Sequence, residues 1–227
     1  MAMITWLSHA SWLIETGESK IILDPFLSDN PTATIKPEDL VGVTDILISH
    51  GHFDHIADAA VIANKNGATI TAIFEIAQWF ADKHKVESTV GMNIGGAAKT
   101  NWGTVKMTPA LHSSQLPDGS YGGEPAGFLL KIEGKRIYFA CDTAIFSDMK
   151  LYAMGVDVAV LPIGDLFTMG IDDSVAATKM LGPARVVPSH YNTWPPIEQD
   201  AQLWADQISQ QTSAKPVILP VGGSFEL

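Results

Sequence analysis

The chain has 227 residues, of which 46% are hydrophobic and 17% are charged, a composition typical of a globular protein and not of a disordered or fibrous one. Its 14 basic and 25 acidic residues give a formal net charge of −11, and no stripe of Lys and Arg runs along the chain, so a nucleic-acid substrate is disfavoured. No apolar run reaches the ~18 residues of a membrane helix, no signal peptide is visible, and the single cysteine, Cys141, excludes an internal disulfide, so we expect a cytoplasmic protein without a membrane partner.

The first 140 residues are predicted to form mainly strands. Short apolar runs bounded by turn residues predict strands at Ile4–Leu7, Ser11–Glu15, Ile21–Asp24, Thr44–Ser49, Ala68–Ala72, Val105–Ala110, Ala126–Ile132 and Arg136–Ala140. Turns are predicted at Gly17-Glu18 and Gly134-Lys135. Helical spacing of apolar residues predicts helices over Ile56–Asn64 and Glu75–His84. The segment from Gln115 to Gly127 is rich in Gly and Pro and predicts a loop, which could cover a functional site.

After residue 142, helices and strands are predicted to alternate. Helices are expected at Asp148–Met154, Asp172–Leu181 and Glu198–Gln210, and strands at Val156–Leu161, Arg185–Pro188 and Pro216–Leu219. Asp172 or Asp173 is the candidate cap of the second helix. Both halves of the chain place strands before helices, which predicts two sheets packed face to face with helices outside. No linker or repeat interrupts this pattern, so we expect one domain spanning residues 1–227.

A cluster of potential metal ligands follows the predicted strand Thr44–Ser49. It reads His50-Gly51-His52-Phe53-Asp54-His55 and places four such residues in six positions, which packing alone does not explain. Residues two apart on an extended segment project to the same side, so His50 and His52 can bind one ion. Asp54 and His55 can then bind a second ion beside it. Imidazole together with carboxylate suits zinc, and also iron, nickel or manganese.

Three further candidate ligands come where predicted strands end. They are His112, Asp142 and His190, and such positions often carry functional loops. Each alone is more often a structural residue than a ligand. Together with the cluster, they supply a third ligand for each ion and a bridging carboxylate.

Weaker candidates flank these positions, and each has a structural alternative. His9 is as consistent with support of the ligands as with a simple turn, and Asp24 either fixes a histidine tautomer or precedes Pro25 in a turn. Asp165 and Thr168 either line a pocket or cap a turn. The residues after His190 serve substrate contact or loop packing; they are Tyr191, Asn192 and Thr193. Cys141 is interpreted as an apolar filler behind the site.

The order H-x-H-x-D-H, then His, Asp and His, resembles the metallo-β-lactamase superfamily over essentially the whole chain. Additional segments resemble its metal-dependent hydrolase branch, which is similar to the ascorbate-6-phosphate lactonases: Leu7-Ser8-His9-Ala10-Ser11, Asp24-Pro25-Phe26, the segment from Pro162 to Gly170, and the segment from Pro188 to Thr193. The resemblance implies an αββα sandwich of two mixed sheets with helices on the outer faces. It also implies one ion on His50, His52 and His112. A second ion is implied on Asp54, His55 and His190, with Asp142 bridging both.

Two adjacent divalent ions would activate water as hydroxide near neutral pH. We therefore expect a binuclear hydrolase, with zinc as the first choice of metal, that acts on an ester-like bond (lactone, phosphodiester or thioester) of a small substrate. Asp54 and Asp142 are the candidate catalytic residues. The alternatives are a mononuclear-iron sulfur dioxygenase and a metal-binding protein without turnover. A homo-oligomer is compatible with the sequence.

Overall fold

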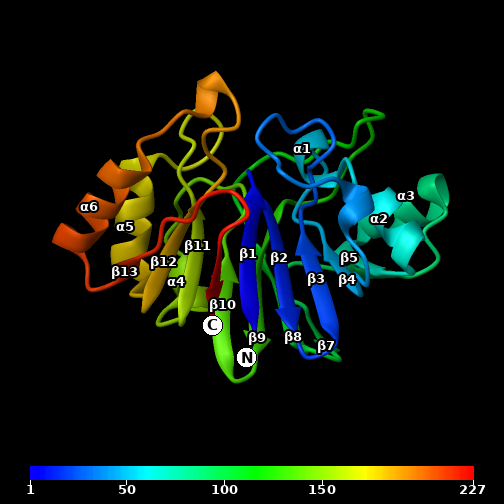
Figure 1. The fold of residues 1–227 in the computed structure, drawn as a ribbon, viewed down its shortest axis with the longest axis horizontal. Helices are drawn as coiled ribbons and strands as arrows, with labels where there is room; N and C mark the ends of the chain where they lie inside the picture. The colour runs from blue at the N-terminus through cyan, green and yellow to red at the C-terminus, as the bar shows by residue number, and fades with distance from the viewer.

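Two seven-stranded β-sheets face each other in the computed structural model, which describes residues 1–227 (Figure 1). The first sheet has the order β14 (Ser224–Glu226), β1 (Met3–Ser8), β2 (Ser11–Thr16), β3 (Ser19–Leu23), β4 (Asp45–Leu47), β5 (Thr69–Ile73) and β6 (Thr89–Met92). The second has the order β13 (Lys215–Pro216), β12 (Arg185–Ser189), β11 (Val158–Pro162), β10 (Lys135–Phe139), β9 (Ala126–Ile132), β8 (Gly103–Pro109) and β7 (Ala97–Thr100). Each sheet combines antiparallel and parallel pairs, as predicted.

Helices cover the outer faces of both sheets, which confirms the predicted αββα sandwich. They are α1 (Phe53–Ile56), α2 (Ala59–Asn66), α3 (Phe74–His84), α4 (Met149–Ala153), α5 (Ile171–Leu181) and α6 (Ala201–Gln211), with 3₁₀ turns η1 (Pro37–Asp39) and η2 (Pro195–Ile197). Helices α2 and α3 pack on β4, β5 and β6, whereas α5 packs on β11 and α6 on β13, so the two helical layers lie on opposite sides in Figure 1. No helix combines the length and apolar character that crossing a membrane requires.

Helix α6 illustrates how the sequence forms these outer helices. The Asp200 carboxylate accepts hydrogen bonds from the backbone N–H groups of Gln202 and Leu203, which satisfies two donors that the first turn leaves free. Trp204 and Ile208 are four residues apart, so they share one face of the helix, and both are fully buried. The polar residues between them face solvent.

Trp12 connects the first sheet to the second directly beneath one edge of the sandwich. Trp12 on β2 packs edge-on against Phe139 on β10, with ring centroids 6.0 Å apart, and both side chains are almost fully buried. A buried indole N–H needs a partner, and that of Trp12 donates to Ser189 Oγ at 3.1 Å. Burial of each ring stabilises the fold by roughly 2–3 kcal/mol. This contact therefore fixes the end of β12, where His190 follows.

The carboxyl ends of strands from both sheets meet at this edge, the upper one in Figure 1. Strands β1, β3 and β4 of the first sheet end there, as do β8, β10, β11 and β12 of the second. Nine residues other than glycine have positive φ, and all except Lys85 and Glu133 follow or end these strands; the seven are Ser8, His9, Asp24, Cys141, Asp165, His190 and Asn192. Such strained backbone concentrates at functional sites.

Several predicted elements were wrong in extent. The segment Ile56–Asn64 does not form one helix, because a turn at Ala57 and Asp58 separates α1 from α2. Gly170 occupies the N-cap position of α5, while Asp172 and Asp173 lie in its first turn, where their charge favours the helix dipole. The last predicted strand is reduced to Lys215–Pro216. Strands β6, β7 and β14 were not predicted, because they are short and much of their surface is exposed.

Candidate metal centre

All seven residues predicted as metal ligands lie at the carboxyl edge of the sandwich. His50, His52, Asp54 and His55 come from the loop after β4 and from α1. The others follow strands of the opposite sheet: His112 after β8, Asp142 after β10 and His190 after β12. The structure thus brings together residues that are up to 140 positions apart in the sequence. Only His52 and His112 are partly exposed.

The first group of potential ligands consists of His50, His52 and His112. One ring nitrogen from each lies within 4.8 Å of the others, and His50 Nε2 is 2.9 Å from His52 Nδ1. Burial lowers the pKa of each of these imidazoles, most strongly that of His50. They are therefore neutral at pH 7, which is the form that binds metals.

The second group consists of Asp54, His55 and His190, joined by His9. Their nearest ligand atoms also lie within 4.8 Å of one another. Asp54 Oδ2 is 3.6 Å from His55 Nε2 and 3.7 Å from His190 Nε2. Burial opposes ionisation of Asp54, but the charge of His55 and the contacts with His190 and His9 hold its pKa well below the usual range.

Asp142 lies between the two groups. Its Oδ2 atom is 3.1 Å from His190 Nε2, 3.3 Å from His55 Nε2 and 3.7 Å from His112 Nε2. Burial opposes ionisation, but the charges of His190 and His55 hold the pKa of Asp142 well below its usual value. A carboxylate with neighbours from both groups is placed to contact two ions.

The hydrogen bonding at this edge fits a metal site. His55 Nε2, His190 Nε2 and Asp142 Oδ1 are buried and have no hydrogen-bond partner, whereas nearly all buried polar atoms in proteins have one. Divalent cations bound to these atoms would satisfy them. Imidazole nitrogens and carboxylate oxygens are the donors that zinc and other first-row metals accept.

Asp24 orients two of the histidines: His55 directly, and His50 through Ser49. Its carboxylate accepts hydrogen bonds from Ser49 N at 2.8 Å, Ser49 Oγ at 2.6 Å and His55 Nδ1 at 2.9 Å. Because the Ser49 hydroxyl donates to Asp24, it accepts from His50 Nδ1 at 2.9 Å. Both imidazoles therefore direct Nε2 toward the site, as such outer contacts do in metal proteins.

His9 supports Asp54. The His9 ring is fully buried between Asp54 Oδ2, 3.0 Å from its Nε2, and Thr193 Oγ1, 2.8 Å from its Nδ1. Burial lowers the pKa of His9 to about 3, so the ring is neutral and donates from one nitrogen while it accepts at the other. The donor faces Asp54, and Thr193 donates to the second nitrogen.

Four of the weaker candidates do not line the site. Asp165 and Thr168 form a turn, in which the Asp165 carbonyl accepts from Thr168 N. Tyr191 is buried and stacks on Trp6 with ring centroids 5.2 Å apart, and Asn192 Oδ1 accepts from the backbone of Gln199. In the structure these four residues contact the segments around them. The Gln115–Gly127 loop also contributes nothing to the cavity wall; it packs against Gly51, where a Cβ would lie 3.2 Å from the Gln115 backbone.

A cavity of about 320 Å³ opens over the ligands. It is lined by His52, Phe53, Asp54, His112, Ser113, Asp142, Phe167, His190 and Trp194. Four of these were not predicted from the sequence: Phe53, Ser113, Phe167 and Trp194. Phe53 and Ser113 adjoin predicted ligands, which was an available signal, but no pattern distinguishes a lining aromatic residue from a core one.

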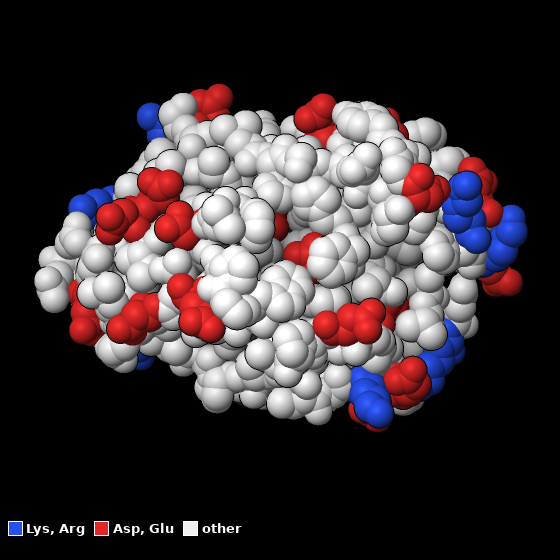
Figure 2. All heavy atoms as spheres, turned by 90° about the horizontal axis from the view of Figure 1, so that it is seen from above, with Lys and Arg blue, Asp and Glu red and all other residues white.

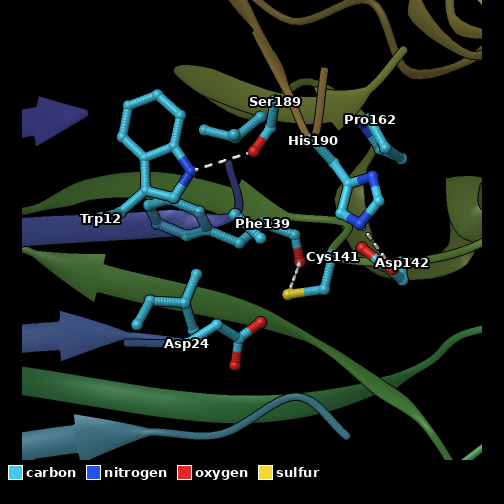
Figure 3. A pocket seen from close by; sticks show the side chains of 11 residues that line it. Trp12, Asp24, Phe139, Cys141, Asp142, Pro162, Ser189 and His190 are labelled. Atoms are coloured by element: carbon cyan, nitrogen blue, oxygen red, sulfur yellow. Dashed lines mark hydrogen bonds and ion pairs between the residues drawn. The ribbon is translucent and has the colours of Figure 1, made fainter. Parts of the chain in front are cut away.

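A second, much smaller void of about 10 Å³ lies behind the site (Figure 3). Asp24, Cys141, Asp142 and His190 border it, and Figure 3 shows the Cys141 side chain between the carboxyl groups of Asp24 and Asp142. Burial raises the pKa of the Cys141 thiol well above its ordinary value. The thiol is therefore not an activated nucleophile.

Comparison with known proteins identifies relatives over the full chain. The family profile described as the beta-lactamase superfamily domain matches residues 13–191. A UPF0173 metal-dependent hydrolase of Pyrococcus furiosus is 43% identical over 231 residues and covers 100% of both chains. One from Thermus thermophilus is 45% identical over 212 residues, 93% of each chain. Among solved structures, Igni18, a metallo hydrolase from Ignicoccus hospitalis, superposes with a TM-score of 0.87 at 34% identity, covering 100% of this chain and 99% of the other.

Proposed function

This chain belongs to the UPF0173 metal-dependent hydrolases of the β-lactamase superfamily, and we propose that it uses two divalent ions, zinc as the first choice, to hydrolyse an ester-like bond of a small substrate. A lactone, a phosphodiester and a thioester are the candidate bonds. We assign His50, His52 and His112 to one ion. Asp54, His55 and His190 are assigned to the other, and Asp142 to both.

One observation carries the proposal of two ions. The buried atoms without partners, His55 Nε2, His190 Nε2 and Asp142 Oδ1, belong to the second group and to the shared carboxylate. A single ion on the first three histidines would leave Nε2 of His55 and Nε2 of His190 without a partner at considerable energetic cost. Two ions satisfy both groups.

When bound, such ions supply Lewis acidity, which ionises water near neutral pH and stabilises negative charge that develops on the substrate. The chain's own residues supply orientation. Asp54 borders the cavity beside the proposed ions, so we infer that it accepts a hydrogen bond from the attacking water and directs it. Phe53 and Trp194 border the same cavity.

The surface around the site supports a small substrate. On the face seen in Figure 2, Lys and Arg lie at the margins and the middle carries none. Binding of nucleic acid would require cations beside the cavity to contact phosphates. We propose that no nucleic acid is bound, and that tight, salt-sensitive binding of RNA or DNA is absent at physiological ionic strength.

Metal analysis of the purified protein tests the proposal against the dioxygenase alternative. We expect two zinc-like ions per chain and hydrolysis of a lactone, thioester or phosphodiester under argon as fast as in air. One iron per chain, with activity that disappears without oxygen, would instead establish the dioxygenase. Two bound ions without turnover of any of the three bond classes would favour a metal-binding protein.

The variant His190→Ala distinguishes the two-ion hydrolase from the one-iron dioxygenase by removing one proposed ligand of the second ion. We expect lower occupancy of the second ion and a hydrolytic rate at least ~10²-fold lower, the scale of losing a strong electrostatic stabiliser. A one-iron enzyme needs no ligand at this position, so unchanged activity would contradict the two-ion proposal. His84→Ala is the matched control, because His84 is exposed at the end of α3.

A further inference from the structure

We propose, on the basis of the hydrolytic function above, that the substrate carries an uncharged apolar group of about phenyl size beside the bond that is cleaved. The group binds against an aromatic wall formed by Phe53, Phe167 and Trp194. The wall and the ligands line the same cavity. A substrate whose reacting bond faces the ligands therefore places its neighbouring group on these three rings.

Two members of the aromatic wall, Phe53 and Trp194, are held in position by a buried neighbour. Phe26, which is fully buried, packs against Phe53 with ring centroids 5.8 Å apart and against Trp194 at 5.7 Å. The rings of Phe53 and Trp194 are themselves 6.0 Å apart. Rings fixed by a buried neighbour lose little freedom when a ligand binds, so they form a ready apolar surface.

The wall leaves much apolar surface uncovered. Phe53 is 57% exposed and Phe167 is 55% exposed. Scattered exposed apolar residues need no explanation, but two such rings that border one cavity at a site of chemistry indicate a binding surface. The cavity volume of about 320 Å³ is at the lower end of the range for ligand sites, which limits the group to roughly one ring.

The charges around the cavity exclude an anionic group at this place. The only charged lining residues apart from histidine are Asp54 and Asp142, and both are assigned to the ions. No Lys or Arg lines the cavity, and those on this face lie at its margins in Figure 2. A carboxylate or phosphate held on the aromatic wall, apart from the ions, would lose water without gaining a Lys or Arg partner, which is costly.

Turnover of matched substrates tests the inference. Three series are compared on the metal-loaded enzyme: γ-substituted butyrolactones, S-methyl thioesters and methyl phosphodiesters, each with a methyl, phenyl or carboxylate substituent. We expect kcat/KM to be at least about 10-fold higher for phenyl than for methyl, given the apolar area buried, and lowest for carboxylate. A preference for the carboxylate member would overturn the inference while hydrolysis stands. Failure of all three series would refute the hydrolytic proposal itself.

Binding supplies a second measurement that is independent of turnover. Titration of the metal-loaded protein with phenylacetamide and with acetamide, followed by ligand-observed NMR, should show at least about 10-fold tighter binding of the phenyl compound. We expect Phe167→Ala and Trp194→Ala to remove this difference. Phe74→Ala should not, because Phe74 is equally exposed, at 58%, but lies on α3 outside the cavity. Equal binding of both amides would contradict the inference.

A change of charge provides the sharpest test. Phe167→Arg places a cation at a half-exposed position of the wall, where the fold tolerates it, and metal content verifies an intact site. We expect the carboxylate substrates to gain at least about 10-fold relative to the phenyl substrates, since a charge-assisted pair then forms. An unchanged ratio would show that Phe167 does not contact the substituent.

Discussion

At the scale of single residues, Asp142 has the greatest influence on the candidate site, because its carboxylate lies within 3.7 Å of three histidine nitrogens from both groups. We expect Asp142→Ala to lose at least one ion and nearly all turnover. The fold should persist, since the residue lies at the rim of the sandwich. Metal analysis and circular dichroism check both statements, with Asp148→Ala, an exposed aspartate nearby, as the control. Retention of two ions would refute the bridging role.

His9 is predicted to act through Asp54. Its Nε2–H donates to Asp54 Oδ2 at 3.0 Å, and losing such a support costs ~10–100-fold in metal affinity. We therefore expect His9→Leu to weaken the second ion by this factor, measured by competition with a chelator.

The variant His9→Gln is the control for this prediction. Its amide places a donor near the position of Nε2 and should restore most of the affinity. If His9→Leu and His9→Gln lose equal affinity, His9 acts only through packing.

The residues that the sequence singled out, and that the structure brings together, are those whose chemistry is unusual. The spacing of His50, His52, Asp54 and His55 has few structural explanations, and the strand ends placed His112, Asp142 and His190 beside them. Phe53, Phe167 and Trp194 could not be recognised in the same way. An exposed aromatic residue and a core aromatic residue have the same local pattern, and only the folded structure distinguishes them.

At the scale of elements, buried strands were predicted more accurately than edge strands. Strands β9 and β12 carry continuous apolar or β-branched runs, which are a strong signal. Strand β7 reads Ala-Ala-Lys-Thr and is half exposed, so it has no periodicity to detect. Its pairing with β8 holds it in the sheet, which is information that the local sequence does not contain.

The loop after β11 approaches His190 closely at Gly164. A Cβ on Gly164 would lie 2.3 Å from the carbonyl oxygen of His190 and 3.3 Å from its Nδ1, so glycine permits the two loops to approach. We expect Gly164→Ala to displace His190, to weaken the second ion at least about 10-fold and to destabilise the fold by about 1–3 kcal/mol. Metal titration and thermal unfolding measure these effects.

Gly170→Ala is the matched control in the same loop. A Cβ there meets only the Asp165 side chain, at 3.1 Å or more, which can move aside. We expect metal affinity close to that of the unchanged protein. Loss of the ion in this variant as well would show that the loop as a whole, and not the contact with His190, controls the site.

At the scale of the whole molecule, buried carboxyl groups gather where the two sheets meet. The chain carries a formal charge of −11, and three aspartates, Asp24, Asp54 and Asp142, are buried at one edge. Without metal, protons on histidines must compensate this charge. Burial lowers the pKa of His190, but Asp142 reverses this effect and raises the pKa to about 9. Neighbouring carboxylates also raise the pKa of His55 well above its ordinary value despite burial.

These pKa values predict opposite effects of pH on the stability of the metal-free and the metal-loaded protein. In the metal-free protein, His190 keeps its proton up to about pH 9, whereas in the unfolded chain it loses it near ~6.5. The folded state therefore binds more protons between pH 7 and 9, so its stability, fully present below ~6.5, falls by about 1.4 kcal/mol per pH unit for each retained proton. The histidines with lowered pKa are neutral in both states across this interval and contribute no slope.

Bound ions replace those protons, because metal ligands bind in their deprotonated form. The metal-loaded protein should therefore keep or gain stability over the interval in which the metal-free protein loses it. Denaturant unfolding at pH 7, 8 and 9, with and without a chelator, measures both slopes. His190→Gln should make the slope of the metal-free protein shallower by the contribution of one proton, while the proton on His55 still contributes. Parallel slopes for the two forms would mean that the ions do not occupy the positions of these protons, and that the second group is not a metal site.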